Sequence, residues 1–174
     1  MTRIYLTGFM GAGKTTVGHA LAAMLHMDAI DLDAWIEKEE GMAPAEIFAE
    51  KGEAYFRKKE TEMLKRAKML QGVIMTGGGI VMREENRRLL KRDGLVVFLD
   101  CDPAILVARI QNDASRPMAS GRTVAELVSL YEKRLPLYRV CADLMVDTSG
   151  KTVDEIVTEI AGRIKPELFG HNGA

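Results

Sequence analysis

The sequence predicts a single α/β domain in which helices cover both faces of a parallel β-sheet, a three-layer sandwich. Short apolar runs alternate with helix-length amphipathic segments along the whole chain. These runs are almost continuously hydrophobic, as expected for strands that are buried on both faces of a parallel sheet. The 174 residues contain no internal repeat and no linker, so we expect one domain over residues 1–166.

Five apolar runs are predicted to be the strands of this sheet. They are Ile4–Thr7, Ala29–Ile30, Val73–Met75, Leu95–Leu99 and Asp143–Val146. A helix-length segment separates each run from the next, which is the spacing of crossover connections in a parallel sheet.

Helix starts are marked by capping residues. Thr15–Leu25 is predicted to be a helix with an apolar stripe that includes Val17, Leu21 and Met24. Further along the chain, Asp102 precedes Pro103, which is a typical helix cap followed by proline at the first helical position.

Two capping boxes predict the starts of the last two helices. Thr123 is followed three residues later by Glu126, and Thr152 by Glu155. We expect the final helix to end at Pro166, which leaves residues 167–174 as a flexible tail.

Composition excludes several classes of protein. The formal net charge is −1 and no block of like charge stands out, so a nucleic-acid partner is not expected. Cys101 and Cys141 form no CxxC pattern, and two unpaired thiols suit a reducing, cytoplasmic setting. No apolar run approaches the length of a membrane span, and no signal peptide is evident. We therefore expect a cytoplasmic monomer without a membrane partner.

The segment Gly8–Thr15 has the pattern G-x-x-x-x-G-K-[ST] of a phosphate-binding loop, between a predicted strand and a predicted helix. Backbone N–H groups of such a loop surround the phosphates of ATP, the lysine adds a positive charge, and the threonine hydroxyl binds Mg²⁺. We assign ATP binding to Gly11, Ala12, Gly13, Lys14, Thr15 and Thr16.

The loop establishes nucleotide binding but leaves the reaction open. A guanine-nucleotide switch would need an Asn-Lys-x-Asp motif, which the chain lacks, and a motor ATPase would need a longer chain. A small kinase is the remaining interpretation.

Asp31 and Asp33 follow the second predicted strand. Residues two apart on an extended chain point the same way, so both carboxylates should reach the ligand edge of the sheet. One can hold a water molecule on Mg²⁺, and the other can accept a proton from an attacking hydroxyl. The alternative is that Asp33 only caps a helix that begins at Ala34.

Glycines and arginines complete the predicted site. Gly77–Gly79 follow the third strand, where glycines let backbone amides approach a substrate. Arg57, Arg116 and Arg134 suggest an anionic acceptor as a set, although each alone is typical of a protein surface. Arg116 lies in a small, polar segment of residues 112–122, which we interpret as a lid or, alternatively, as a disordered loop.

These motifs, in this order, resemble those of the shikimate kinases over nearly the whole chain. The matching motifs are Gly8–Thr16, Asp31-x-Asp33, Phe56-Arg57-x-x-Glu60, Gly77–Gly79, Arg116-Pro117 and Arg134-x-x-x-Tyr138. The resemblance implies a P-loop kinase fold with five parallel strands in the order 2-3-1-4-5. It also implies transfer of the γ-phosphate of ATP to the 3-hydroxyl of shikimate, in the synthesis of chorismate and aromatic amino acids.

The resemblance further implies a role for each matching residue. The acceptor-binding region is expected within residues 33–60 and at the later motifs, with shikimate held by Asp33, Arg57, Gly78, Gly79 and Arg134. Lys14, Asp33 and Arg116 would be catalytic, with Asp33 as the base and Arg116 on the phosphates of ATP. Thr15 and Asp31, the latter through water, would hold one Mg²⁺, and Glu60 would orient Arg57. Arg109 and Lys151 are candidates for contacts with adenine.

Two alternatives remain open from the residues themselves. One is another small-molecule kinase of the same fold, for a substrate such as gluconate or a nucleotide. The other is an inactive binding domain that resembles a shikimate kinase, although retention of Lys14 and Asp33 argues against it.

Overall fold

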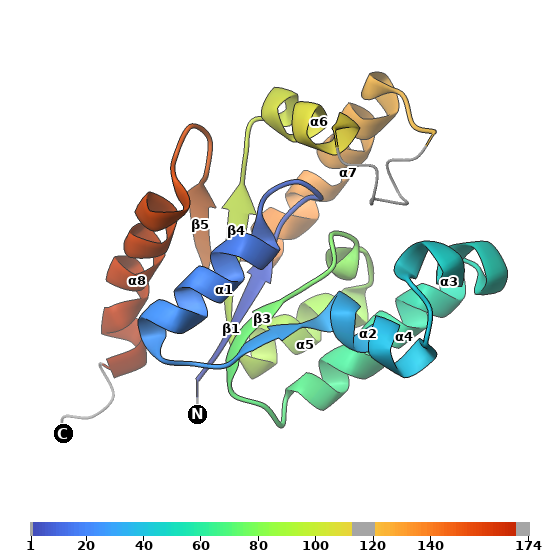
Figure 1. Cartoon of the computed structure of the whole chain (residues 1–174). Helices are drawn as coiled ribbons and strands as arrows, with labels where there is room; N and C mark the ends of the chain where they lie inside the picture. Colours follow the sequence, from blue (N-terminus) through green and yellow to red (C-terminus); the bar gives the residue numbers. More distant parts are fainter. Residues whose placement is uncertain (1, 113–120, 170–174) are drawn as a thin grey trace.

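The computed structural model describes residues 2–112 and 121–169, with side chains as far as residue 164, and its centre is a five-stranded parallel sheet (Figure 1). The strands are β1 (Arg3–Thr7), β2 (Ala29–Asp31), β3 (Gly72–Met75), β4 (Leu95–Asp100) and β5 (Leu144–Asp147). They are ordered β2-β3-β1-β4-β5, and every neighbouring pair is parallel. The predicted α/β class and strand order are therefore confirmed.

Helices form a layer on each face of the sheet. In Figure 1, α1 (Lys14–Leu25) and α8 (Val153–Phe169) lie side by side in front of the sheet, and α5 (Glu84–Asp93) and α7 (Val124–Cys141) lie behind it. The helix α6 (Pro103–Gln111) packs on α7. A 3₁₀ turn, η1 (Ile80–Met82), follows β3.

A group of three helices packs together beyond the β2 edge of the sheet, and we call it the three-helix group. It consists of α2 (Leu32–Glu40), α3 (Pro44–Lys51) and α4 (Glu53–Ala67). The sequence did not predict α3, because Ile47 is its only buried residue and one residue makes no apolar stripe.

The central strands are buried as predicted, whereas the edge strands are not. Every residue of β3 is buried, and so are four of the five residues of β1. Ala29 of β2 and Met145 of β5 are exposed, since an edge strand has a neighbour on one side only. The expectation of burial on both faces is wrong for these two strands.

The predicted stripe on α1 is partly wrong, because Met24 is 47% exposed. The helix buries Val17 and Leu21 as predicted, together with Gly18 and Ala22. A side chain on Gly18 would overlap the sulfur atom of Met75, so the glycine allows α1 to pack closely on β3.

The predicted helix caps are present. The Asp102 carboxylate accepts a hydrogen bond from the Ala104 N–H at 2.8 Å. In both capping boxes the threonine N–H donates to the glutamate carboxylate at 2.7 Å, and the glutamate N–H donates to the threonine hydroxyl at 3.2 Å. These local signals are strong because each contact joins residues only two or three positions apart.

The final helix does not end at the proline where its end was predicted. The helix α8 continues through Pro166 to Phe169, so the predicted end is wrong and the predicted tail begins inside a helix, with residues 170–174 outside the described chain. The helix α7 also contains a proline, Pro136, and continues through it, which places Arg134 in the middle of the helix. A proline removes one backbone donor, and in α7 the buried side chains on both sides of it outweigh that cost.

Among residues 2–112 and 121–169, no helix is both long enough and apolar enough to cross a membrane.

Candidate active site

The phosphate loop joins β1 to α1. Gly11 and Gly13 have φ angles of +83° and +88°, in a left-handed region that side chains disfavour, so the turn requires glycine at both positions. Gly13 is also the N-cap of α1, and no side chain caps this helix end. The first N–H groups of the helix are therefore available to an anion, and the helix dipole adds to the attraction.

Lys14 and Thr15 are the first two residues of α1. The Lys14 ammonium donates to the carbonyls of Gly8 at 2.5 Å and Phe9 at 3.1 Å, so it lies back over the loop. The Thr15 hydroxyl donates to the Asp31 carboxylate at 3.4 Å. The phosphate loop and the end of β2 are thus joined by a contact between the Thr15 hydroxyl and the Asp31 carboxylate.

The phosphate loop opens into a cavity of about 310 Å³ between the sheet edge and the three-helix group. Most of the residues predicted for the site line this cavity, namely Gly11, Gly13, Lys14, Thr15, Thr16, Asp31, Asp33, Arg57, Gly78 and Arg134. Ala12 and Gly79 are buried and lie outside the lining, and Arg116 lies outside the described residues. The sequence analysis missed Pro44 and Phe48, which also line the cavity, because no motif marks α3.

The two aspartates differ from the prediction in geometry. Asp31 ends β2 and is the N-cap of α2, with its carboxylate accepting from the Ala34 N–H at 3.0 Å. Asp33 lies in the first turn of α2, so the two carboxylates do not share an extended strand. The capping role considered for Asp33 therefore belongs to Asp31. Both aspartates still line the cavity.

Asp33 is a half-buried residue whose carboxyl Oδ1 is inaccessible to solvent and has no hydrogen-bond partner among the described residues. Burial is the main cause that raises its pKa to about 6, and the negative charge of Asp31 adds to the effect. The positive charges of Lys14 and Arg57 oppose the increase. A carboxyl with a pKa near neutrality is suited to accept a proton from a substrate hydroxyl.

Arg57 and Glu60 form an ion pair on α4, in which Glu60 is buried and Arg57 is partly buried. The Arg57 Nη1 donates to Glu60 Oε2 at 2.7 Å, and Nη2 contacts Glu53 at 3.3 Å. Burial acts to lower the pKa of Arg57, but the carboxylates of Glu60 and Glu53 together outweigh burial, and the pKa is raised. Burial also raises the pKa of Glu60 to about 7, against the effect of Arg57. The pair fixes the direction of the Arg57 guanidinium.

The glycines after β3 provide space for these charged groups. A methyl group on Gly77 would lie 2.6 Å from Glu60 Oε1 and 2.9 Å from Asp33 Oδ1, and one on Gly79 would overlap the Arg57 guanidinium. None of the three glycines has a positive φ, so backbone strain does not explain them. Their small size lets the carboxylates and the guanidinium converge on the turn.

Arg134 is a buried guanidinium, only 3% exposed, in the middle of α7. It forms no ion pair with any described carboxylate, and its Nε has no hydrogen-bond partner there. Burial lowers its pKa, and the nearby charge of Arg57 contributes to the decrease. Its guanidinium lies 5.7 Å from the ring centre of Phe9 in the phosphate loop. Two neighbouring buried cations favour an anion between them.

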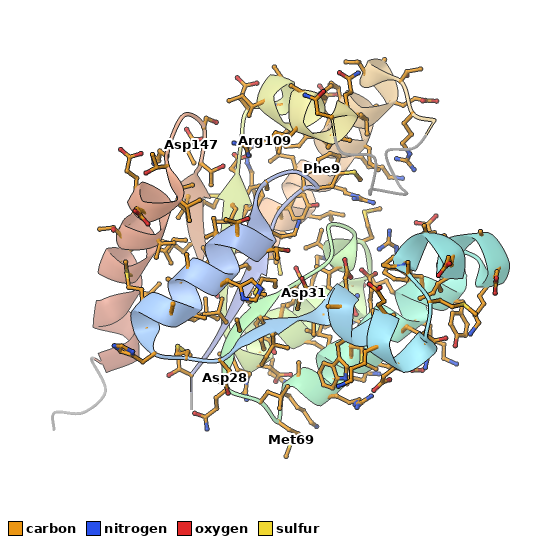
Figure 2. The ribbon with its side chains drawn as sticks, viewed as in Figure 1. Phe9, Asp28, Asp31, Met69, Arg109 and Asp147 are labelled. Atoms are coloured by element: carbon orange, nitrogen blue, oxygen red, sulfur yellow. The ribbon has the colours of Figure 1, made fainter. Side chains whose placement is uncertain are left out.

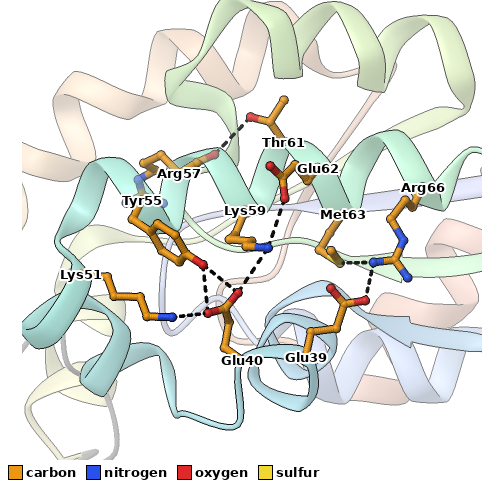
Figure 3. A network of polar contacts seen from close by, with 10 residues as sticks. All are labelled: Glu39, Glu40, Lys51, Tyr55, Arg57, Lys59, Thr61, Glu62, Met63 and Arg66. Atoms are coloured by element: carbon orange, nitrogen blue, oxygen red, sulfur yellow. Dashed lines mark hydrogen bonds and ion pairs between the residues drawn. The ribbon is translucent and has the colours of Figure 1, made fainter.

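Glu40 connects the helices of the three-helix group (Figure 3). Its carboxylate accepts hydrogen bonds from Lys51 at 2.7 Å and from the Tyr55 hydroxyl at 3.0 Å, and pairs with Lys59 at 3.3 Å. The hydrogen bond from Lys51 is the main cause that lowers the pKa of Glu40 to about 2. The network joins α2 to α3 and α4, the helices that form one wall of the cavity.

The two candidates for adenine contacts differ in position. Arg109 of α6 donates to the Gly11 carbonyl at 3.0 Å, next to the phosphate loop (Figure 2). The Lys151 ammonium pairs instead with Glu159 of α8 at 2.7 Å. Only Arg109 contacts the loop directly.

Thr15 and Asp31 fit the chemistry of a magnesium ligand set. Both provide oxygen atoms, which lie 3.4 Å apart. Within the described residues, no group of three His, Cys, Asp or Glu side chains is arranged for a metal. Mg²⁺ in kinases needs no such group, because one or two protein oxygens, water and the phosphates of ATP complete its coordination.

A comparison with models of protein families identifies the family of this chain. The model described as "SKI: Shikimate kinase" matches residues 10–165. The chain belongs to the shikimate kinase family. The resemblance seen in the sequence is thereby confirmed, and the protein is a kinase by family.

Curated relatives agree over nearly their whole length. A shikimate kinase of Bacillus anthracis (strain CDC 684 / NRRL 3495) is 44% identical over 164 residues, which cover 94% of this chain and 99% of the relative. A shikimate kinase of Enterococcus faecalis (strain ATCC 700802 / V583) is 41% identical over 167 residues, covering 95% and 99% of the two chains.

Solved structures give the same result. A shikimate kinase from Acinetobacter baumannii in complex with shikimate has a TM-score of 0.91 and 33% identity, covering 97% of this chain and 96% of the other. The Aquifex aeolicus enzyme has a TM-score of 0.84 and 37% identity, covering 97% and 99%. A gluconokinase from Sinorhizobium meliloti 1021, at 20% identity, a TM-score of 0.62 and 99% and 98% coverage, shows only a shared fold.

Proposed function

We propose that this member of the family transfers the γ-phosphate of ATP to the 3-hydroxyl of shikimate, giving shikimate 3-phosphate and ADP. One observation carries the proposal. The partly buried guanidinium of Arg57, the buried guanidinium of Arg134 and the carboxyl of Asp33 belong to one cavity that opens onto the phosphate loop. This combination suits an acceptor that carries both a carboxylate and hydroxyl groups.

The acceptor is held by complementary charge. Arg57 and Arg134 bind its carboxylate, because a guanidinium can donate two parallel hydrogen bonds to a carboxylate. Gly78, which lines the cavity, brings the backbone close to the substrate, with Gly79 next to it in the same turn. Asp33 accepts hydrogen bonds from the hydroxyls of the substrate. The two arginines lose their mutual repulsion when an anion lies between them.

The phosphates of ATP lie against the backbone N–H groups of Gly11–Thr16 and against the Lys14 ammonium. Thr15 and, through water, Asp31 would hold one Mg²⁺, which neutralises charge on the phosphates when bound. Arg116, outside the described residues, would contribute a further positive charge to the phosphates. Asp33 takes the proton of the attacking hydroxyl.

A coupled assay for ADP release tests this function. Release should depend on shikimate, and gluconate or nucleoside monophosphates at the same concentration should support no more than background hydrolysis. Dependence on gluconate or a nucleotide instead would assign another acceptor, and no release with any acceptor would indicate an inactive binding domain. The cytoplasmic location and the monomeric state remain predictions from the sequence.

A further inference from the structure

Tyr138 is a fully buried tyrosine, one helical turn after Arg134 on α7. Its hydroxyl donates a hydrogen bond to the Gly78 carbonyl, in the turn after β3. Its ring stacks on Phe98 of β4, with 5.0 Å between ring centres and 13° between ring planes. The stacked ring and the hydrogen bond together hold the phenol in one position.

This hydrogen bond fixes the direction of a backbone N–H. The Gly78 carbonyl belongs to the peptide group that carries the Gly79 N–H, and the two point in opposite directions because the peptide is planar and trans. The Gly79 N–H donates to no residue of the described chain. A run of three glycines has wide backbone freedom, so the contact with Tyr138 limits the orientations open to this peptide.

The glycine to which Tyr138 bonds also lies next to Arg134. A methyl group on Gly78 would lie 3.5 Å from Arg134 Nη1 and 3.4 Å from the Met10 amide nitrogen, so Gly78 lies between α7 and the phosphate loop. Burial lowers the pKa of Arg134, and the Tyr138 hydroxyl opposes part of this decrease. The phenol therefore bonds to the glycine turn at the residue that lies beside the Arg134 guanidinium.

We propose that Tyr138 is a positioning residue for the acceptor, whose hydroxyl fixes the Gly78–Gly79 peptide and the Arg134 guanidinium relative to each other. The inference rests on the proposed function, in which these groups bind shikimate. Without the hydroxyl, the turn gains freedom and the guanidinium loses a polar neighbour. Shikimate binding should weaken, while the ATP side of the site stays unchanged.

Tyr131→Phe is a matched control for Tyr138→Phe. Tyr131 lies on the same helix, is nearly buried, and donates its hydroxyl to Asp100 at 2.8 Å, away from the glycine turn. Each variant loses one buried hydroxyl and keeps its ring, so the loss of thermal stability should be similar. Tyr138→Phe should raise the KM for shikimate about fivefold to tenfold, the effect of one hydrogen bond, with the KM for ATP within about twofold. Tyr131→Phe should leave both values within about twofold.

The outcomes separate two failures. Equal shifts of the shikimate KM in both variants, or no shift in Tyr138→Phe, would overturn the positioning role while the proposed function stands. A wild-type protein that does not phosphorylate shikimate would overturn both. If Tyr138→Phe does not fold, Phe98→Leu keeps the hydroxyl but loosens the ring, and an unchanged shikimate KM in that variant would also overturn the role.

Discussion

Replacing Asp33 with asparagine removes a buried negative charge and keeps the shape of the side chain. Burial raises the pKa of Asp33 from 3.8 to about 6, so the folded state binds the proton more tightly than the unfolded state. Ionisation of Asp33 therefore destabilises the fold: the cost is absent below about pH 4, grows as the pH rises from 4 to 6, and is complete above pH 6. A pKa difference of this size corresponds to about 3 kcal/mol at pH 7.

We expect ligand-free Asp33→Asn to be more stable than the wild type by up to about 3 kcal/mol at pH 7. This corresponds to an increase in Tm of about 6–12 °C for a domain of this length. At pH 4 the two proteins should differ little. Urea unfolding at both pH values measures the difference. Glu62→Gln, which removes an exposed carboxylate from α4, is the control and should change stability by less than about 0.5 kcal/mol.

Turnover should change in the opposite direction. Loss of a positioned base lowers kcat by about 10²–10⁴-fold, and by less if the transition state is loose. The wild-type rate should fall about tenfold for each pH unit below 6, and this acid limb should be absent in Asp33→Asn. The stability cost assigned to the Asp33 charge is refuted if Asp33→Asn is no more stable than the wild type at pH 7, or if it is stabilised equally at pH 4 and pH 7. Either result would show that the charge of Asp33 does not lower the free energy of unfolding.

Other substitutions test the remaining groups. Arg57→Lys should raise the Kd for shikimate about tenfold or more with ATP affinity unchanged, because an ammonium lacks the paired donors; equal affinity in calorimetric titration would remove Arg57 from the site. Gly79→Ala should weaken shikimate binding, because the added methyl group would displace the Arg57 guanidinium. Gly162→Ala is the control and should leave binding unchanged, since a methyl group there meets nothing within 4 Å. Equal effects of the two substitutions on the Kd for shikimate would show that the small size of Gly79 is not needed. Asp31→Asn keeps a helix cap but should raise the Mg²⁺ concentration needed for half-maximal turnover, and an unchanged magnesium titration would exclude Asp31 as a ligand.

The phosphate loop and the helix caps could be predicted because their contacts are local. Gly11 and Gly13 adopt their turn within one short segment, and Thr123 and Glu126 bond across three residues. The strand order came from the family resemblance, since apolar runs alone do not specify which strands are neighbours.

The predictions that failed depended on packing between distant segments. Pro166 was expected to end the final helix, but α8 continues through it to Phe169. Asp33 was placed on an extended strand, yet α2 begins at Leu32 and gives the cap to Asp31. The local sequence does not contain the energy of contacts formed many residues away.

The sequence by itself determined the α/β class, the phosphate loop and the family, and it named the charged residues of the acceptor site. Only the tertiary structure decided how those residues act on one another. Asp33, Arg57, Glu60 and Arg134 come from three helices and meet around a glycine turn. Their pKa values are set by burial and by one another's charge, which arise only when α2, α4 and α7 exclude water from a shared cavity.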